Sequence, residues 1–244
     1  MMDRVGALYE PLVAAARSRL AADAGLRKVV DPGTDALLVE RYLVQFTSMA
    51  VQMTEPVEGW IRRAGERCIE VGLEDVGKSL CQHAHHEAGH HLMLIADTRH
   101  LVAHWNARHP DQLDADALLS QPATAATRAY VDLHETTIAG PAPAGQVAIE
   151  YEIEHMSTVI GPPQIAQFGR VLGGEIMAGL SFLKEHVEID VGHTALNKKM
   201  LERLLDHDPG MAEMLGRLGS KALNTYVDFL DDCLAGAELA LRGN

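Results

Sequence analysis

The chain has little cysteine. Its three cysteines, Cys68, Cys81 and Cys233, are widely spaced over 244 residues, and no Cys-x-x-Cys pair occurs. Three such thiols cannot all pair within one chain, which disfavours a secreted domain held together by disulfides. We therefore expect free thiols and a cytoplasmic protein.

Long apolar runs are also missing, and basic residues are few. No run of about 18 apolar residues occurs, so we expect no membrane-spanning helix. The N-terminal stretch carries Asp3 and Glu10 and lacks a sustained apolar core, unlike a signal peptide. Lys and Arg number 21 against 34 Asp and Glu, and the net charge of −13 disfavours nucleic acid or an anionic membrane as a partner.

Strand signals are missing too, and helical periodicity takes their place. The sequence shows no convincing alternation of polar and apolar residues and no Asn-Gly hairpin turn. A chain of 244 residues with 47% hydrophobic residues is ample for a buried core, and we find no repeat or clear linker. We predict an all-α fold in which residues 1–244 form one helical bundle.

Turn residues divide the chain into predicted helices. Gly161-Pro162-Pro163 should end one helix, and Gly173-Gly174 is a candidate break in the next. Residues 109–122 should form a loop with a short turn at 115–119. The predicted helices cover residues 3–24, 74–105, 123–138, 146–160, 164–204 and 211–241, with two further helices on either side of Pro56.

The segment 182–200 carries the most specific pattern in the chain. His186, Asp190 and His193 are spaced at i, i+4 and i+7. On a helix, i+4 lies about 40° round the axis and i+7 about 20° the other way, so all three side chains leave one face. Two imidazoles and a carboxylate on one face predict a site for a divalent cation.

A second cluster lies at residues 81–91, where the sequence reads CQHAHHEAGHH. Glu87 and His90 are three residues apart, the Glu-x-x-His arrangement by which helical di-iron sites take a carboxylate and an imidazole from one helix. His83 lies one turn before Glu87 on the same side, and we expect it to orient a ligand rather than bind metal itself. His91 competes with His90 as the ligand, and the sequence leaves that choice open.

A third helix, residues 146–160, offers carboxylates. Glu150 and Glu154 share one face with apolar residues, and Glu152 lies on the opposite one. A carboxylate on a buried face is costly unless it is paired, protonated or bound to metal. Tyr151, on the same helix, is a second candidate for orienting a ligand or delivering a proton.

The donor types and their number indicate which metal is bound. Imidazole and carboxylate donors without thiolate fit iron or manganese better than structural zinc. Six donors are too many for one ion that keeps an open coordination position, and about right for two ions. The candidate ligands are Glu87, His90, Glu154, His186, Asp190 and His193.

These residues resemble a known family. Glu87-Ala-Gly-His90, the YEIEHMS segment around Glu154 and the HxxxDxxH element of residues 186–193 are similar to motifs of the heme-oxygenase-like di-iron oxidases and oxygenases, also called iron-containing redox enzymes. The resemblance covers roughly residues 39–200. Because the separation of Glu154 from His186 is similar to that in family members, we prefer Glu154 to Glu150 as a ligand.

The resemblance implies a heme-oxygenase-like bundle that holds two Fe(II) ions and uses O2 as co-substrate. It implies a small-molecule substrate, which is N-oxygenated if an amine, or desaturated or cleaved at a C–C bond if an amino or fatty acid. The same six candidate ligands would act in catalysis through the metal pair. An extra ligand from Glu40, an external electron donor and a homodimer stay open.

Two other functions fit parts of the pattern. A helical bundle that binds metal without turnover would also explain the histidine-rich segment. A metal-independent hydrolase of the thiaminase kind shares the expected fold but needs a catalytic cysteine, and Cys81 and Cys233 lie in no recognisable nucleophile pattern. Turnover-dependent O2 consumption separates the oxidase from the metal-binding bundle, and metal-independent activity would indicate the hydrolase.

Overall fold

The computed structural model describes residues 3–242, and all regular structure within them is helical. The prediction of an all-α fold is thereby confirmed. Short π- or 3₁₀-helical segments occur at Val5–Tyr9, Pro143–Gly145, Gly174–Gly179 and Pro209–Met211. The α-helices are α1 (Glu10–Ala22), α2 (Ala24–Val30), α3 (Ala36–Thr54), α4 (Val57–Glu70), α5 (Glu74–Glu87), α6 (His90–Asn106), α7 (Ala115–Leu119), α8 (Ala125–Ala139), α9 (Gln146–Leu172), α10 (Ser181–His207) and α11 (Ala212–Arg242).

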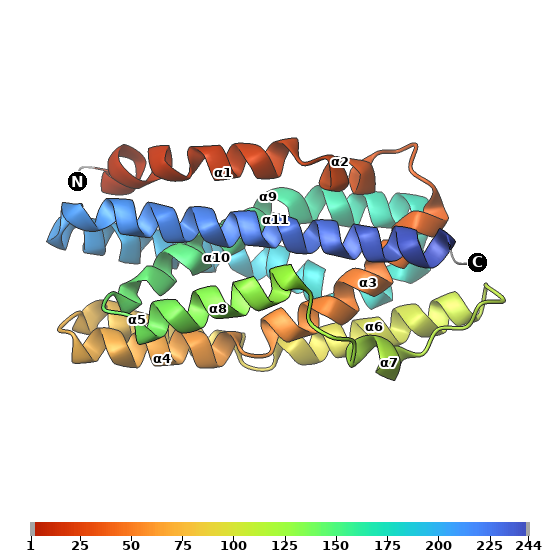
Figure 1. Ribbon diagram of the computed structural model, residues 1–244, viewed down its shortest axis with the longest axis horizontal. Coiled ribbons are helices and arrows are strands. Elements are labelled where there is room, and N and C mark those ends of the chain that lie inside the picture. The colour runs from red at the N-terminus through yellow and green to blue at the C-terminus, as the bar shows by residue number, and fades with distance from the viewer. Residues whose placement is uncertain (1–2, 243–244) are drawn as a thin grey trace.

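Helix α11 spans most of the long axis of the molecule, with α1 and α9 alongside it (Figure 1). Its apolar face contacts α1, α3, α8 and α9, so one helix touches most of the bundle. Buried residues recur along it from Leu215 through Phe229 to Ala237. This spacing of apolar residues at helical period builds the continuous core that the other helices share.

Helices α9 and α10 pack closely along their length, and together they carry most of the candidate site. Gly161 makes this approach possible, because a Cβ added there would lie 2.5 Å from Cγ2 of Val187 on α10. The N-terminus of α10 is capped by a side chain from another helix. Asp97 of α6 accepts hydrogen bonds from the backbone N–H groups of Ser181 (3.1 Å) and Phe182 (2.9 Å).

The predicted stop at Gly161-Pro162-Pro163 is wrong, because α9 continues through it to Leu172. Each proline removes one backbone hydrogen bond, to the carbonyls of Thr158 and Val159. Val159 is 55% exposed, so water can reach this side of the helix. The buried residues beyond the prolines, among them Phe168, continue the packing and stabilise the helix across the defect.

The single helix predicted over residues 74–105 is also wrong, because it breaks between α5 and α6. Gly89 has a φ of +87°, in the left-handed region that favours glycine, and it ends α5 and begins α6. Glu87 is therefore the last residue of α5 and His90 the first of α6. The two candidate ligands meet across a turn and do not share a helix face.

Other predicted boundaries are confirmed. Helix α9 ends just before Gly173-Gly174, a short helix covers Ala115–Leu119, and α3 and α4 are separated at Pro56. Within residues 3–242 no helix has the length and apolar character needed to cross a membrane. All three cysteines are unpaired.

Candidate metal centre

Four helices bring imidazoles and carboxylates to one place inside the bundle. His83 and Glu87 end α5, His90 begins α6, Glu154 lies on α9, and α10 supplies its three predicted donors. The six predicted ligands all lie in this region. They come from parts of the chain as far apart as residues 87 and 193, so tertiary packing assembles the site.

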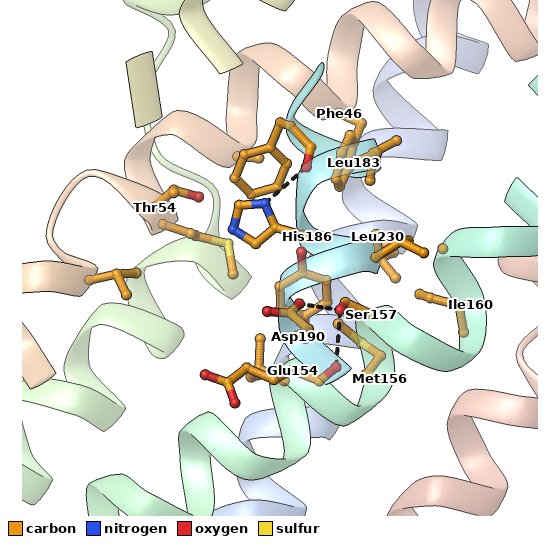
Figure 2. A pocket seen from close by; sticks show the side chains of 18 of the residues that line it. Phe46, Thr54, Glu154, Met156, Ser157, Ile160, Leu183, His186, Asp190 and Leu230 are labelled. Carbon is orange, nitrogen blue, oxygen red and sulfur yellow. Dashed lines mark hydrogen bonds between the residues drawn. The ribbon is translucent and has the colours of Figure 1, made fainter. Parts of the chain in front are cut away.

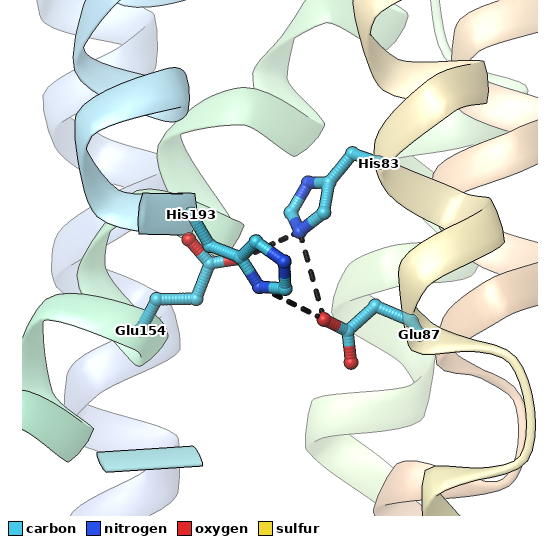
Figure 3. Close-up of side chains that lie close together, drawn as sticks. All are labelled: His83, Glu87, Glu154 and His193. Carbon is cyan, nitrogen blue, oxygen red and sulfur yellow. Dashed lines mark ion pairs between the residues drawn. The ribbon is translucent and has the colours of Figure 1, made fainter. Parts of the chain in front are cut away.

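Four of these side chains form a first donor group, shown in Figure 3. His83, Glu87, Glu154 and His193 each place one ligand atom within 4.8 Å of the others, and all four are buried. Nδ1 of His193 lies 3.1 Å from Oε1 of Glu87, and Nε2 of His83 lies 2.8 Å from Oε1 of Glu154. The group has two imidazoles and two carboxylates, a donor set suited to one iron or manganese ion.

A second donor group contains Glu87, His90 and His186. Nδ1 of His90 lies 2.9 Å from Oε2 of Glu87, and Nε2 of His186 lies 4.0 Å from the same oxygen. Glu87 thus belongs to both groups, with Oε1 facing the first and Oε2 facing the second. A carboxylate in this position can bridge two cations.

Asp190 lies beside these groups without belonging to either. Its Oδ1 is 3.6 Å from Nδ1 of His193 and has no hydrogen-bond partner, although the side chain is buried. Ser157 of α9 donates a hydrogen bond to the other oxygen, Oδ2 (Figure 2). Asp190 therefore keeps one oxygen free at the edge of the site.

Charge pairing decides the ionisation of these groups. Burial opposes ionisation of Glu87, but contacts with His193, His83 and His90 outweigh it and lower the pKa of this carboxylate. Burial also opposes charge on His83, yet Glu154 and Glu87 raise its pKa to about 11. The pKa of His193 is likewise raised to about 9, by Asp190 and Glu87 against burial. In the metal-free protein these imidazoles hold protons that a cation would displace.

The tautomer of His186 also suits a metal ligand. Its Nδ1 lies 2.9 Å from the carbonyl oxygen of Phe182, so the ring donates its Nδ1–H there and Nε2 keeps its lone pair. Burial lowers the pKa of this imidazole, which favours the neutral form. Nε2 and the Glu87 carboxylate are then two acceptors facing each other, and the space between them suits a cation.

Several buried polar atoms at the donor groups lack hydrogen-bond partners, which also supports cation binding here. Both ring nitrogens of His83, Nδ1 of His193 and Oδ1 of Asp190 are buried without a hydrogen-bond partner. The short approach of His83 to Glu154 lacks the geometry of a hydrogen bond. Buried polar atoms usually find partners, and buried donor atoms that converge while several of them lack a hydrogen bond fit a pair of divalent cations.

The two residues expected to orient ligands or deliver protons lie in different places. His83, expected only to orient a ligand, places its own nitrogen among the donor atoms of the first group. Tyr151 is the second residue expected to orient a ligand or deliver a proton. It packs on Tyr9, the last residue of the short Val5–Tyr9 segment, with ring centroids 5.9 Å apart, and lies under the guanidinium of Arg17. Its face of α9 is turned toward α1 and away from the donor groups.

The three alternatives that the sequence left open are placed as follows. His91 belongs to neither donor group, whereas His90 does. Glu150 is buried near Glu154 and accepts a hydrogen bond from Gln146, and burial together with Glu154 raises its pKa to about 8. Glu40 is only 3% exposed and pairs with Arg108 and His109, apart from both groups.

Some supporting residues escaped the sequence analysis. Asn197 of α10 donates a hydrogen bond to Oε2 of Glu154, and Ser157 fixes Asp190. Neither residue stands out in the sequence, because a lone Asn or Ser on a helix carries no spacing signal. His83 did carry a signal, since it lies one turn from Glu87 on the same side.

A cavity of about 100 Å³ adjoins the donor groups (Figure 2). On the same measure roughly 10–15 Å³ suffices for one water, so a small organic molecule fits. Glu87, Glu154, His186 and Asp190 reach into its wall, and most of the remaining wall is apolar. The residues that complete the wall come from α3, α4, α8, α9, α10 and α11.

Comparison with known proteins shows what the fold resembles. No protein-family model and no curated protein matches the sequence. A domain of unknown function with a heme oxygenase-like fold from Shewanella denitrificans OS217 is similar in structure, with a TM-score of 0.71 and 18% identity over 96% of this chain and 94% of that one. A TenA homolog from Pseudomonas syringae pv. tomato DC3000 has a TM-score of 0.69 and 14% identity over 95% and 93%. The chain has a heme-oxygenase-like fold, as predicted.

Proposed function

We propose that the chain is a non-heme di-iron oxidase or oxygenase that acts on a small organic substrate. The observation that carries this proposal is the position of Glu87, whose two oxygens face two separate donor groups. One shared carboxylate with imidazoles on both sides supports a pair of ions better than a single ion.

Each residue of the donor groups would bind one or both of the two ions. His83, Glu154 and His193 would hold one Fe(II), His90 and His186 the other, and Glu87 both, with Asp190 beside them. When bound, the two ferrous ions would supply electrons to O2, and an external donor would restore them. Ser157 and Asn197 orient carboxylates, and the apolar wall of the cavity excludes water from the site.

The cavity favours an enzyme over a metal store. A store needs donors but no space for an organic molecule beside them, whereas here both donor groups contribute to the wall of one cavity. Substrate N-oxygenation, desaturation and C–C cleavage all remain compatible with this arrangement.

The thiaminase-like hydrolase is the second candidate, favoured by the likeness to a TenA homolog. Its chemistry needs an activated thiol at the cavity. Cys68, Cys81 and Cys233 all lie outside the cavity wall. Burial raises the pKa of each thiol, to about 12 for Cys68, which opposes thiolate formation. We therefore prefer the di-iron function.

The test is an anaerobic Fe(II) titration followed by exposure to O2, observed by stopped-flow absorbance. We expect binding near two ions per chain and a transient visible band after O2 is added. The same chain loaded with Zn(II), which has no redox chemistry, is the control and should give no band. Binding of one ion or none, with no reaction toward O2, would refute the proposal.

A further inference from the structure

The cavity carries its charged groups at one end. The charged and imidazole side chains in its wall are Glu87, Glu150, Glu154, His186 and Asp190, all at or near the donor groups. Among the described residues that line it, none is Lys or Arg. Away from the donor groups, a carboxylate buried along this wall would find no Lys or Arg to pair with, and burying an unpaired charge costs several kcal/mol.

Gln164 lines the same cavity farther along α9. It follows Glu154 by ten residues, which is roughly 15 Å along the helix axis at 1.5 Å per residue. Glu150, Glu154, Ser157, Gly161 and Gln164 all face within about 40° of one line along the helix. The cavity wall therefore runs along α9 from the carboxylates to this amide.

The amide of Gln164 has no hydrogen-bond partner within the described part of the chain. The side chain is only 5% exposed, and its Nε2 is a buried donor without an acceptor. Phe46, Ile160 and Leu230 are among the apolar residues that share this wall. A buried amide left unpaired in an apolar surround is costly, and a bound molecule that supplies the missing partner would remove that cost.

We propose that the cavity binds an aliphatic molecule with an uncharged hydrogen-bonding end, such as an alcohol or a primary amide, and that Gln164 binds this end. The apolar body would lie along α9, with its other end at the donor groups. Naming this molecule as the substrate rests on the proposed function; its binding does not.

The test measures binding to the metal-free chain, by displacement of an apolar fluorescent probe, for 1-decanol and decanoate. We expect 1-decanol to bind at least ten-fold more tightly than decanoate. Gln164→Leu and Gln164→Met should each weaken 1-decanol binding about three- to ten-fold, the worth of one hydrogen bond. Neither should lower the Tm, because an unpaired amide is removed.

Gln167→Leu is the matched control. Gln167 is equally buried on α9, but its amide donates to the carbonyl of Asp31 and accepts from Arg170, and it does not line the cavity. This variant should bind 1-decanol as the unmodified chain does. Equal affinity for decanoate and 1-decanol, no binding of either, or unchanged 1-decanol affinity in both Gln164 variants would overturn the inference. Since no iron or O2 is present, these results are independent of the Fe(II) titration.

Discussion

At the scale of single residues, Glu87 is the side chain on which both donor groups depend. It is buried, it contacts His193 and His90 through different oxygens, and those contacts lower its pKa. His186, by contrast, belongs to one group only. The two residues should therefore differ in how many ions their removal affects.

We predict that Glu87→Gln weakens Fe(II) binding at both sites at least ten-fold, whereas His186→Ala abolishes one site and keeps every ligand of the other. The number of bound ions is measured by anaerobic titration and metal analysis. Glu185→Gln is the control, because Glu185 is next to His186 in sequence but exposed. Loss of only one ion in Glu87→Gln would show that this carboxylate is not shared.

At the scale of elements, the break between α5 and α6 fixes the positions of the candidate ligands Glu87 and His90. Sequence periodicity continues through residues 74–105, and one glycine inside a helical pattern is commonly tolerated. The left-handed conformation of Gly89 ends the helix here, and it places Glu87 and His90 on opposite sides of a turn. Such a conformation disfavours any side chain with a Cβ.

Gly89→Ala should lower the free energy of unfolding by about 1 kcal/mol or more, because alanine is strained at a φ of +87°. Gly192→Ala is the matched control. Gly192 lies inside α10 with open space around its Cβ position, so alanine there should raise the free energy by about 0.5–1 kcal/mol. Urea denaturation measures both. Equal effects of the two variants would contradict the role given to the turn.

The elements also show how much the sequence can predict. Helical periodicity and turn residues predicted most helices and their ends, because those signals are local. The Gly-Pro-Pro step in α9 misled the prediction, because packing beyond it, which is not local, keeps the helix intact. The same limit applies to the site: the spacing of His186, Asp190 and His193 was readable, but the approach of His83 to Glu154 depends on how α5 meets α9.

At the scale of the whole molecule, the buried charges couple folding to pH. His83 and His193 have raised pKa values of about 11 and about 9 in the folded chain, against about 6.5 in the unfolded chain. The folded chain therefore binds more protons in this range. Their contribution to stability is complete below pH 6.5 and is lost as the pH rises through about 9 and then about 11.

We predict that the metal-free protein becomes less stable from pH 6.5 to 10, as measured by urea denaturation at fixed ionic strength. His193→Gln should flatten the part of this decline around pH 9. His207→Gln is the control, since His207 is exposed at the end of α10 and belongs to neither donor group. Stability that is constant or rising over this range would mean that these imidazoles are neutral in the folded chain.

If the proposed function holds, the shared carboxylate has a consequence for the order in which the two ions bind. A cation at either donor group would fix the Glu87 side chain, so the next cation would meet a ligand that is already ordered. Such coupling is reciprocal, because each ion changes the affinity for the other by the same factor. At low iron supply the chains would then divide into empty and doubly loaded molecules, with few that hold a single ion.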